Sequence, residues 1–231
     1  MKLLYCYVTF LDRNGNPRPL RGMSELEFNF STTEVYRYDK VSDILHCSKR
    51  NTPLPDYFWA NGSPETNIYN INVIAGVNGS GKTTAIQYLM DLLNYIYHGF
   101  GGALSDRDRH IRHDPSANRN LLLFDTGGGL RYLDLRQGEI SGGLQTSGFQ
   151  APPLPLNRAE SVNCLQKMKV INLNNTLTRR DCMLHSGNDE RLRNKFIFDC
   201  TLGATIGLDS SISSLSGANH SSLFFATGCV I

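Results

Sequence analysis

A glycine-rich segment near the middle of the chain carries the residue types of a phosphate-binding loop. Residues 76–83 have the sequence GVNGSGKT, which matches the pattern GxxxxGK[ST]. Three glycines of this segment, Gly76, Gly79 and Gly81, permit positive φ angles. Successive backbone N–H groups can therefore approach phosphate oxygens without a Cβ clash. The spacing is not that of the GxGxxG dinucleotide-binding loop, in which a lysine has no role.

The last residues of this motif supply charge and a metal ligand. We expect Lys82 to reach the β- and γ-phosphates of a nucleotide, and the Thr83 hydroxyl to ligate the Mg²⁺ that bridges them. The helix that follows adds the positive end of its dipole. The residues predicted to bind nucleotide in this segment are Gly76, Asn78, Gly79, Ser80, Gly81, Lys82, Thr83 and Thr84.

The flanking sequence predicts the elements that such a loop needs. Tyr69–Ala75 is a short apolar run rich in β-branched residues, typical of a buried parallel strand. After Lys82 the period changes to that of an amphipathic helix, with Ile86, Leu89 and Leu93 on one side, and Gly99 marks its end. The motif therefore lies between a predicted strand and a predicted helix.

Other segments predict further strands. Leu3–Leu11 and Leu26–Phe30 are expected to pair antiparallel, and Asn120–Leu135 to form a hairpin around Asp125-Thr126-Gly127-Gly128-Gly129. Ser31–Thr66 shows no sustained period and predicts an irregular insertion. Gly138–Leu156 predicts a loop or linker.

The last third of the chain is less regular. Met168–Leu173 is expected to be a buried strand, and Glu190–Phe196 a short helix or mixed segment. The chain then becomes rich in Gly and Ser and ends in the apolar run Leu223–Ala226, for which the sequence indicates no packing partner.

Composition and charge argue against several classes of protein. The chain has 231 residues, 40% of them hydrophobic, and 23 Lys and Arg against 21 Asp and Glu, so a net charge of +2 gives no bulk argument for nucleic acid or membrane binding. The apolar run Ile71–Val77 is far shorter than a membrane span. The six cysteines form no CxxC pair, which favours reduced thiols in the cytoplasm over a disulfide scaffold or zinc ribbon.

The string GVNGSGKTT, preceded by INVIA and by strands ending in LEFNF, resembles the amino-terminal half of an ABC/SMC-type ATPase head. The most similar groups are the RecF-like, SbcC-like and overcoming-lysogenization-defect-like AAA family ATPases. The resemblance implies an α/β P-loop NTPase with a mixed sheet, here incomplete. We expect a P-loop lobe over residues 1–140, and a linker with a partial second subdomain over 141–231.

The resemblance also implies a function. Such heads bind Mg-ATP between two copies, so a homodimer or a partner subunit would complete the site, and DNA is the partner expected from roles in DNA repair or phage defence. One head supplies the P-loop and the other a serine-glycine signature. A later Walker B strand ends in Asp-Glu, which holds Mg²⁺ and activates water. No membrane partner is expected.

The sequence departs from the family in this later half. Leu121–Asp125 imitates a Walker B strand, but the triple glycine after it favours a hairpin turn over a magnesium role for Asp125. A small GTPase would also need an NKxD motif to recognise guanine, and this motif is absent from the sequence. Phe196–Cys200 is a second imitation, with Asp199 followed by Cys200 where a catalytic glutamate should stand.

The remaining site candidates each have a simpler alternative. Ile140–Leu144 and Leu215–Asn219 are similar to a signature segment, yet the first is predicted to be linker and the second lacks a glycine. Gln137 is the best-placed glutamine to sense a γ-phosphate, and a surface glutamine is the alternative. His110 and His113 could share a metal, but their mixed-charge surroundings favour a solvated loop.

Three functional hypotheses follow from these observations. The chain is part of a hydrolysing ATPase whose Walker B strand and signature lie on a further stretch or another polypeptide. Alternatively, it binds ATP as a conformational ligand without appreciable hydrolysis. The third hypothesis is a truncated or decayed ATPase fragment without a stable fold.

Overall fold

The computed structural model describes residues 2–51, 68–74, 81–100, 115–174, 197–199 and 221–227. Within these ranges the chain forms three β-sheets, here named A, D and E, and two α-helices, α1 and α3. The short 3-10 helix η1 (Pro115–Ala117) precedes the hairpin of sheet A. No helix among these residues has the length and apolar character needed to span a membrane.

Sheet A has the strand order β10-β7-β6-β1-β2, and β8 also pairs with β7. The pairs β1–β2, β1–β6 and β6–β7 are antiparallel, which confirms both the two early strands and the predicted hairpin. Its strands are β1 (Lys2–Thr9), β2 (Glu25–Asn29), β6 (Arg119–Asp125), β7 (Leu130–Arg136), β8 (Glu139–Ser141) and β10 (Leu154–Pro155).

Sheet D consists of β3 (Glu34–Asp39), β4 (Ile44–Lys49) and β9 (Gln145–Ser147). Its β3–β4 hairpin corrects the prediction that Ser31–Thr66 is irregular, which was wrong for residues 34–49. Tyr36 and Tyr38 are buried two positions apart, but charged neighbours on the solvent side mask this alternation in the sequence. Residues 52–66 lie outside the described ranges.

The interval Gly138–Leu156, predicted to be a loop or linker, contains three short strands. β8 and β10 pair with β7, and β9 pairs in parallel with β4. Residues on both sides of position 140 therefore contribute to sheets A and D. The prediction missed these strands because each has only two or three residues, too few to show a period.

Sheet E has the order β12-β11-β13-β5, and all its pairs are parallel. It consists of β5 (Ile68–Ile74), β11 (Met168–Asn174), β12 (Ile197–Asp199) and β13 (Ser221–Thr227). The predicted strands at Tyr69–Ala75 and Met168–Leu173 are confirmed as β5 and β11. The apolar tail is β13, which pairs with both of them. The predicted segment Glu190–Phe196 lies outside the described residues.

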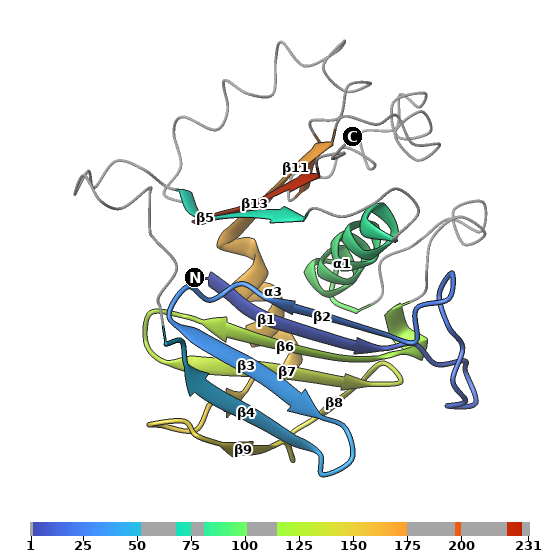
Figure 1. Cartoon of the computed structure of the whole chain (residues 1–231), viewed down its shortest axis with the longest axis horizontal. Coiled ribbons are helices and arrows are strands. Elements are labelled where there is room, and N and C mark those ends of the chain that lie inside the picture. The colour runs from blue at the N-terminus through green and yellow to red at the C-terminus, as the bar shows by residue number, and fades with distance from the viewer. Residues whose placement is uncertain are drawn as a thin grey trace.

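Helix α1 (Lys82–Tyr97) lies between sheets A and E (Figure 1). Its bounds confirm the predicted helix and its end before Gly99. Helix α3 (Arg158–Gln166), which the sequence analysis did not predict, packs near α1 and leads into β11. Its first turn is closed by a capping box between Asn157 and Glu160, a signal that is readable as N-x-x-E in the sequence.

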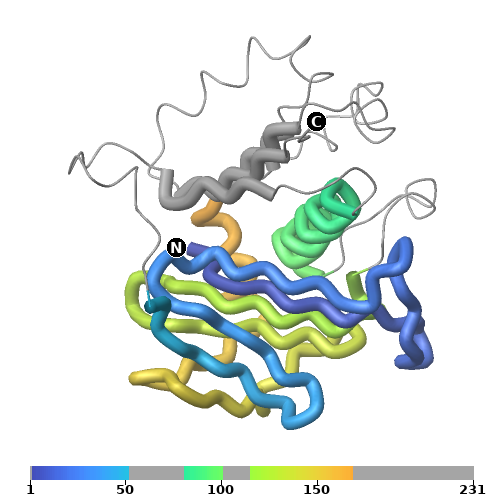
Figure 2. Tube along the Cα trace, in the orientation of Figure 1, coloured from blue at the N-terminus to red at the C-terminus, as the bar shows by residue number. Residues whose placement is uncertain are grey.

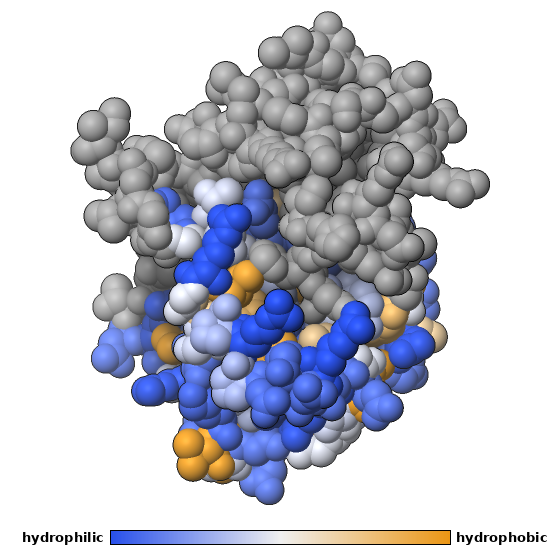
Figure 3. All heavy atoms as spheres, turned by 90° about the vertical axis from the view of Figure 1, so that its right-hand side faces the viewer, coloured by the Kyte–Doolittle hydropathy of each residue, from blue (hydrophilic) through white to orange (hydrophobic). Residues whose placement is uncertain are grey.

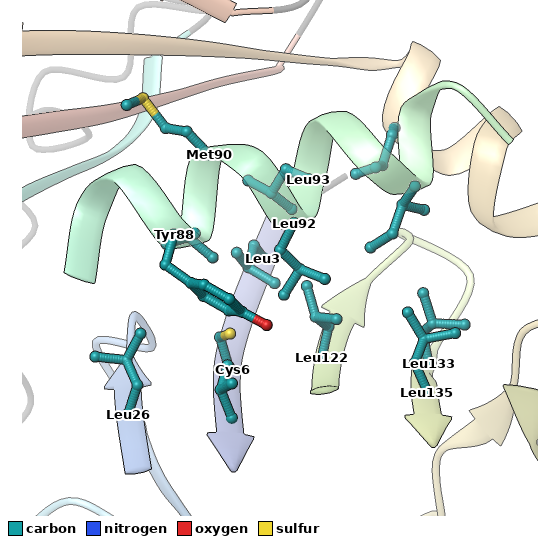
Figure 4. Packing of buried hydrophobic residues seen from close by; sticks show 14 of the residues in the cluster. Leu3, Cys6, Leu26, Tyr88, Met90, Leu92, Leu93, Leu122, Leu133 and Leu135 are labelled. Carbon is teal, nitrogen blue, oxygen red and sulfur yellow. The ribbon is translucent and has the colours of Figure 1, made fainter. Parts of the chain in front are cut away.

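The two faces of sheet A bury different clusters. Figure 2 shows α1 above this sheet and the sheet D hairpin below it. Figure 4 shows the α1 side, where Cys6, Leu122 and Leu133 point toward the helix, while Met90 points the other way, toward sheet E. The alternate residues, Tyr5 among them, form a second cluster with sheet D. The alternation of side chains along each strand thus makes sheet A the central layer.

Buried polar groups set the position of α1 on the sheet. The Tyr88 hydroxyl donates to Asn120 Oδ1 at 2.6 Å and accepts from Asn118 Nδ2 at 2.8 Å. Asn120 Nδ2 donates to the Pro115 carbonyl, and the Leu11 N–H donates to Asn118 Oδ1. A buried hydroxyl without such partners would be costly, so this network favours one rotation of the helix about its axis.

An ionic cluster joins sheet D to sheet A. Asp134, fully buried in β7, accepts from Arg119 and Arg136, with N···O distances of 3.2 and 2.8 Å. Both arginines also bind Asp43 in the β3–β4 turn, at 2.7 and 2.8 Å. Partial burial alone would raise the pKa of Asp43, but hydrogen bonds from Tyr38, Arg119 and Arg136 lower it to about 2.

We predict that Asp43 stabilises the fold at neutral pH and loses this effect in acid. Its folded pKa of about 2 lies below the unfolded value of 3.8, so the contribution is present above about pH 4 and is lost as the pH falls toward 2. Allowing for solvent screening, Asp43→Asn should cost about 1 kcal/mol near pH 7. Urea unfolding of both proteins between pH 7 and pH 2.5 measures this, and a pH-independent difference would contradict the prediction.

Candidate phosphate-binding site

The candidate site lies where β5 ends and α1 begins. β5 ends at Ile74 and α1 starts at Lys82, so the motif spans the connection between a parallel strand and a helix. Of the predicted binding residues, Gly76, Asn78, Gly79 and Ser80 lie outside the described ranges, while Gly81, Lys82, Thr83 and Thr84 lie within them. This strand-to-helix context is the one that the motif requires.

Gly81 is the N-cap of α1 and adopts φ 84°, in the left-handed region. This conformation favours glycine over residues with a side chain. The cap position makes no side-chain hydrogen bond, and the first turn of the helix contains no acidic residue. The positive end of the helix dipole is thus not neutralised by a carboxylate of its own first turn, which suits an anionic ligand.

A second segment, the hairpin Leu11–Met23 between β1 and β2, touches the start of α1. The Arg21 guanidinium donates to Thr84 Oγ1 at 3.3 Å, and Thr84 is only 4% exposed. Met23 packs on Gly81, with its Sδ 2.9 Å from the point where a Cβ would stand. Arg21 itself is exposed and has φ 49°, which is unusual for a residue with a side chain.

The sequence does not reveal the contacts of Arg21 and Met23 with the start of α1, because both residues precede the motif by some 60 positions. The hydrogen bond from Arg21 to Thr84 spans 63 positions. Arg21 and Gly22 both have positive φ, and they reverse the chain between Leu20 and Met23. This hairpin lies at the right of Figure 1, and Figure 3 shows the molecule from that side. The described surface in Figure 3 is mostly hydrophilic.

Backbone register places polar residues beside the end of β5. Ile74 pairs with Thr227 of β13, which pairs with Asn174 of β11, so the three strands end at the same level. Asp199 of β12 pairs with Asn172, two residues further back. With strands about 4.8 Å apart, Asp199 lies three strands from β5, or roughly 14 Å.

Two other predicted candidates belong to sheet A and its turns, not to the β5–α1 connection. Asp125 ends β6 in sheet A, and its carboxylate accepts from the Gly127 N–H at 2.8 Å, as expected for the hairpin turn. Gln137 is exposed in the β7–β8 turn, and the next residue, Gly138, lies near the Tyr95 hydroxyl. Tyr95 follows Lys82 by 13 positions, or about 20 Å along the helix axis. The structure does not bring Gln137 to the start of α1.

The remaining candidates divide between described and undescribed residues. Ile140–Leu144 comprises the end of β8 and the turn into β9, and the Gly142 carbonyl accepts from the Tyr132 hydroxyl. Leu215–Asn219, His110 and His113 lie outside the described ranges. Within those ranges, no three His, Cys, Asp or Glu side chains cluster as a metal site.

Comparison with models of protein families, with curated proteins and with solved structures finds no match to this chain. The α/β class with mixed sheets is therefore established from its own strands and helices.

We predict that Gly81→Ala destabilises the protein more than Gly22→Ala. Both glycines have φ near 85°, so each alanine should cost about 1 kcal/mol in backbone strain. At Gly22 nothing lies within 4 Å of the added Cβ, whereas at Gly81 it would meet Met23 Sδ. Urea unfolding of the two variants measures the excess, and Met23→Ala in both backgrounds should remove it. Equal losses in the two single variants would refute the packing of Met23 on Gly81.

Proposed function

We propose that this protein binds Mg-ATP through the connection between β5 and α1. The observation that carries this proposal is that GVNGSGKTT spans the turn from a parallel strand into a helix whose first residue is Lys82. An accidental match to the motif would not be expected to occupy this place in an α/β fold. The proposed fold is that of a P-loop NTPase of the ABC/SMC type.

The residues around the start of α1 fit such a ligand. Gly81 has the left-handed conformation that a phosphate-cradling turn needs, and the helix end is free of acidic residues in its first turn. Lys82 would bind the β- and γ-phosphates, and the Thr83 hydroxyl would hold Mg²⁺. When bound, the Mg²⁺ neutralises phosphate charge. Arg21 adds an exposed guanidinium within hydrogen-bond reach of Thr84.

Neither of the two described carboxylates that imitate a Walker B aspartate lies on a strand next to β5. Asp125 belongs to sheet A, and Asp199 ends the strand of sheet E farthest from β5. Nucleotide binding is therefore the function proposed for these residues. Hydrolysis would need a general base from outside the described residues or from a second polypeptide, as in a head dimer. By analogy with the family, such an assembly would act on DNA in repair or phage defence.

Replacing Lys82 should abolish or strongly weaken nucleotide binding. Loss of a charge-assisted phosphate contact is worth about 1.5–3 kcal/mol, so Lys82→Ala should bind Mg-ATP at least about tenfold more weakly. Titration calorimetry measures the affinity, and Lys49→Ala, an exposed lysine on β4, is the matched control for loss of charge. Unchanged affinity in Lys82→Ala would refute the proposal. Phosphate release from the same samples separates hydrolysis from binding.

Arg21 should contribute to the same affinity. Arg21→Ala is expected to weaken Mg-ATP binding about three- to tenfold, because it removes a cation that lies beside the first turn of α1. Arg18→Ala removes an exposed arginine of the same hairpin and is the control. Titration with ATP, ADP and AMP shows which phosphates are involved. If the two arginine variants bind equally, Arg21 has no specific role.

A further inference from the structure

The segment Ala151–Leu156, APPLPL, shows a three-residue period of exposure. Pro153 and Leu156 are buried, whereas Ala151, Pro152, Leu154 and Pro155 are exposed. Leu154 is 55% exposed, and among the described residues it and Val41 are the two large apolar side chains classed as exposed. A period of three is that of the polyproline II helix, in which every third side chain lies on the same row.

The buried row attaches this segment to sheet A. Leu154 and Pro155 form β10, which pairs in parallel with Arg131 and Tyr132 of β7, and the Leu156 N–H donates to the Tyr132 carbonyl at 2.8 Å. β10 is the edge strand at this end of sheet A. The extended conformation is thus already ordered, so a partner would lose little conformational entropy on binding it.

The prolines also restrict how a partner could bind. Pro152, Pro153 and Pro155 have no backbone N–H, so this edge cannot extend the sheet by a regular strand addition. What the segment offers instead is two exposed dipeptides, Ala151-Pro152 and Leu154-Pro155, separated by a buried residue. Aromatic-lined grooves that recognise PxxP sequences bind such rows of side chains.

We propose that Ala151–Pro155 is a docking segment for a protein domain with an aromatic-lined, PxxP-reading groove of the SH3 kind. The two exposed dipeptides enter the groove, while Pro153 and Leu156 remain packed on the chain itself. The surface belongs to β10, not to the β5–α1 connection, so this proposal does not depend on nucleotide binding.

The test uses the full chain and an SH3 domain chosen because it binds the free peptide 149–158. Titration calorimetry should show saturable binding of the chain, and Pro152→Ala/Pro155→Ala should weaken it at least about tenfold. The matched control is Pro17→Ala/Pro19→Ala, which changes two exposed prolines of the Leu11–Met23 hairpin. Thermal melting verifies that both variants fold.

Several outcomes would overturn the proposal. They are failure of every SH3 domain in a panel to bind the free peptide, binding of the peptide but not of the folded chain, and equal binding by the two double variants. Sedimentation equilibrium tests whether the segment binds a second copy of this chain instead. Self-association that is lost in Pro152→Ala/Pro155→Ala would assign the segment to that contact.

Discussion

Burial of helix α1 on both of its sides is the constraint on which the rest of the structure depends. Leu89, Leu92 and Leu93 are fully buried, and Met90 extends toward sheet E from the opposite side (Figure 4). Each such side chain contributes about 1.5–3 kcal/mol when removed from water. Because apolar burial is not directional, the polar network around Tyr88 is needed to select one orientation of the helix.

The fixed position of α1 also fixes the position of its first turn, which carries the candidate site. Lys82 begins the helix, and the hairpin that ends in Met23 packs against Gly81. The same hairpin is tied at its base to the Tyr88 network, through the hydrogen bond from Leu11 to Asn118. The body of α1 and its first turn therefore share one support. A site built on ordered elements holds its ligand groups more precisely than one built on loops alone.

The other face of sheet A is held by different interactions. Here the interface with sheet D combines tyrosine rings with the cluster of Asp43, Arg119, Asp134 and Arg136. Buried ion pairs repay their desolvation only when geometry is good, and here both arginines link Asp43 of the β3–β4 turn to Asp134 of β7. The cluster therefore fixes where the β3–β4 hairpin docks. It lies on the face of sheet A opposite α1, so it supports the fold without taking part in the candidate site.

The sequence by itself determined the elements whose signals are local. Hydrophobic periods identified β1, β2, β5, α1 and the β6–β7 hairpin, and the motif indicated Gly81–Thr84 as candidate site residues, because these patterns depend on neighbours a few positions apart. Other features required the tertiary structure. The pairing of β13 between β5 and β11, the docking of β3–β4 and the contact of Arg21 with Thr84 join residues far apart in the chain. Such contacts arise from packing, which no local period encodes.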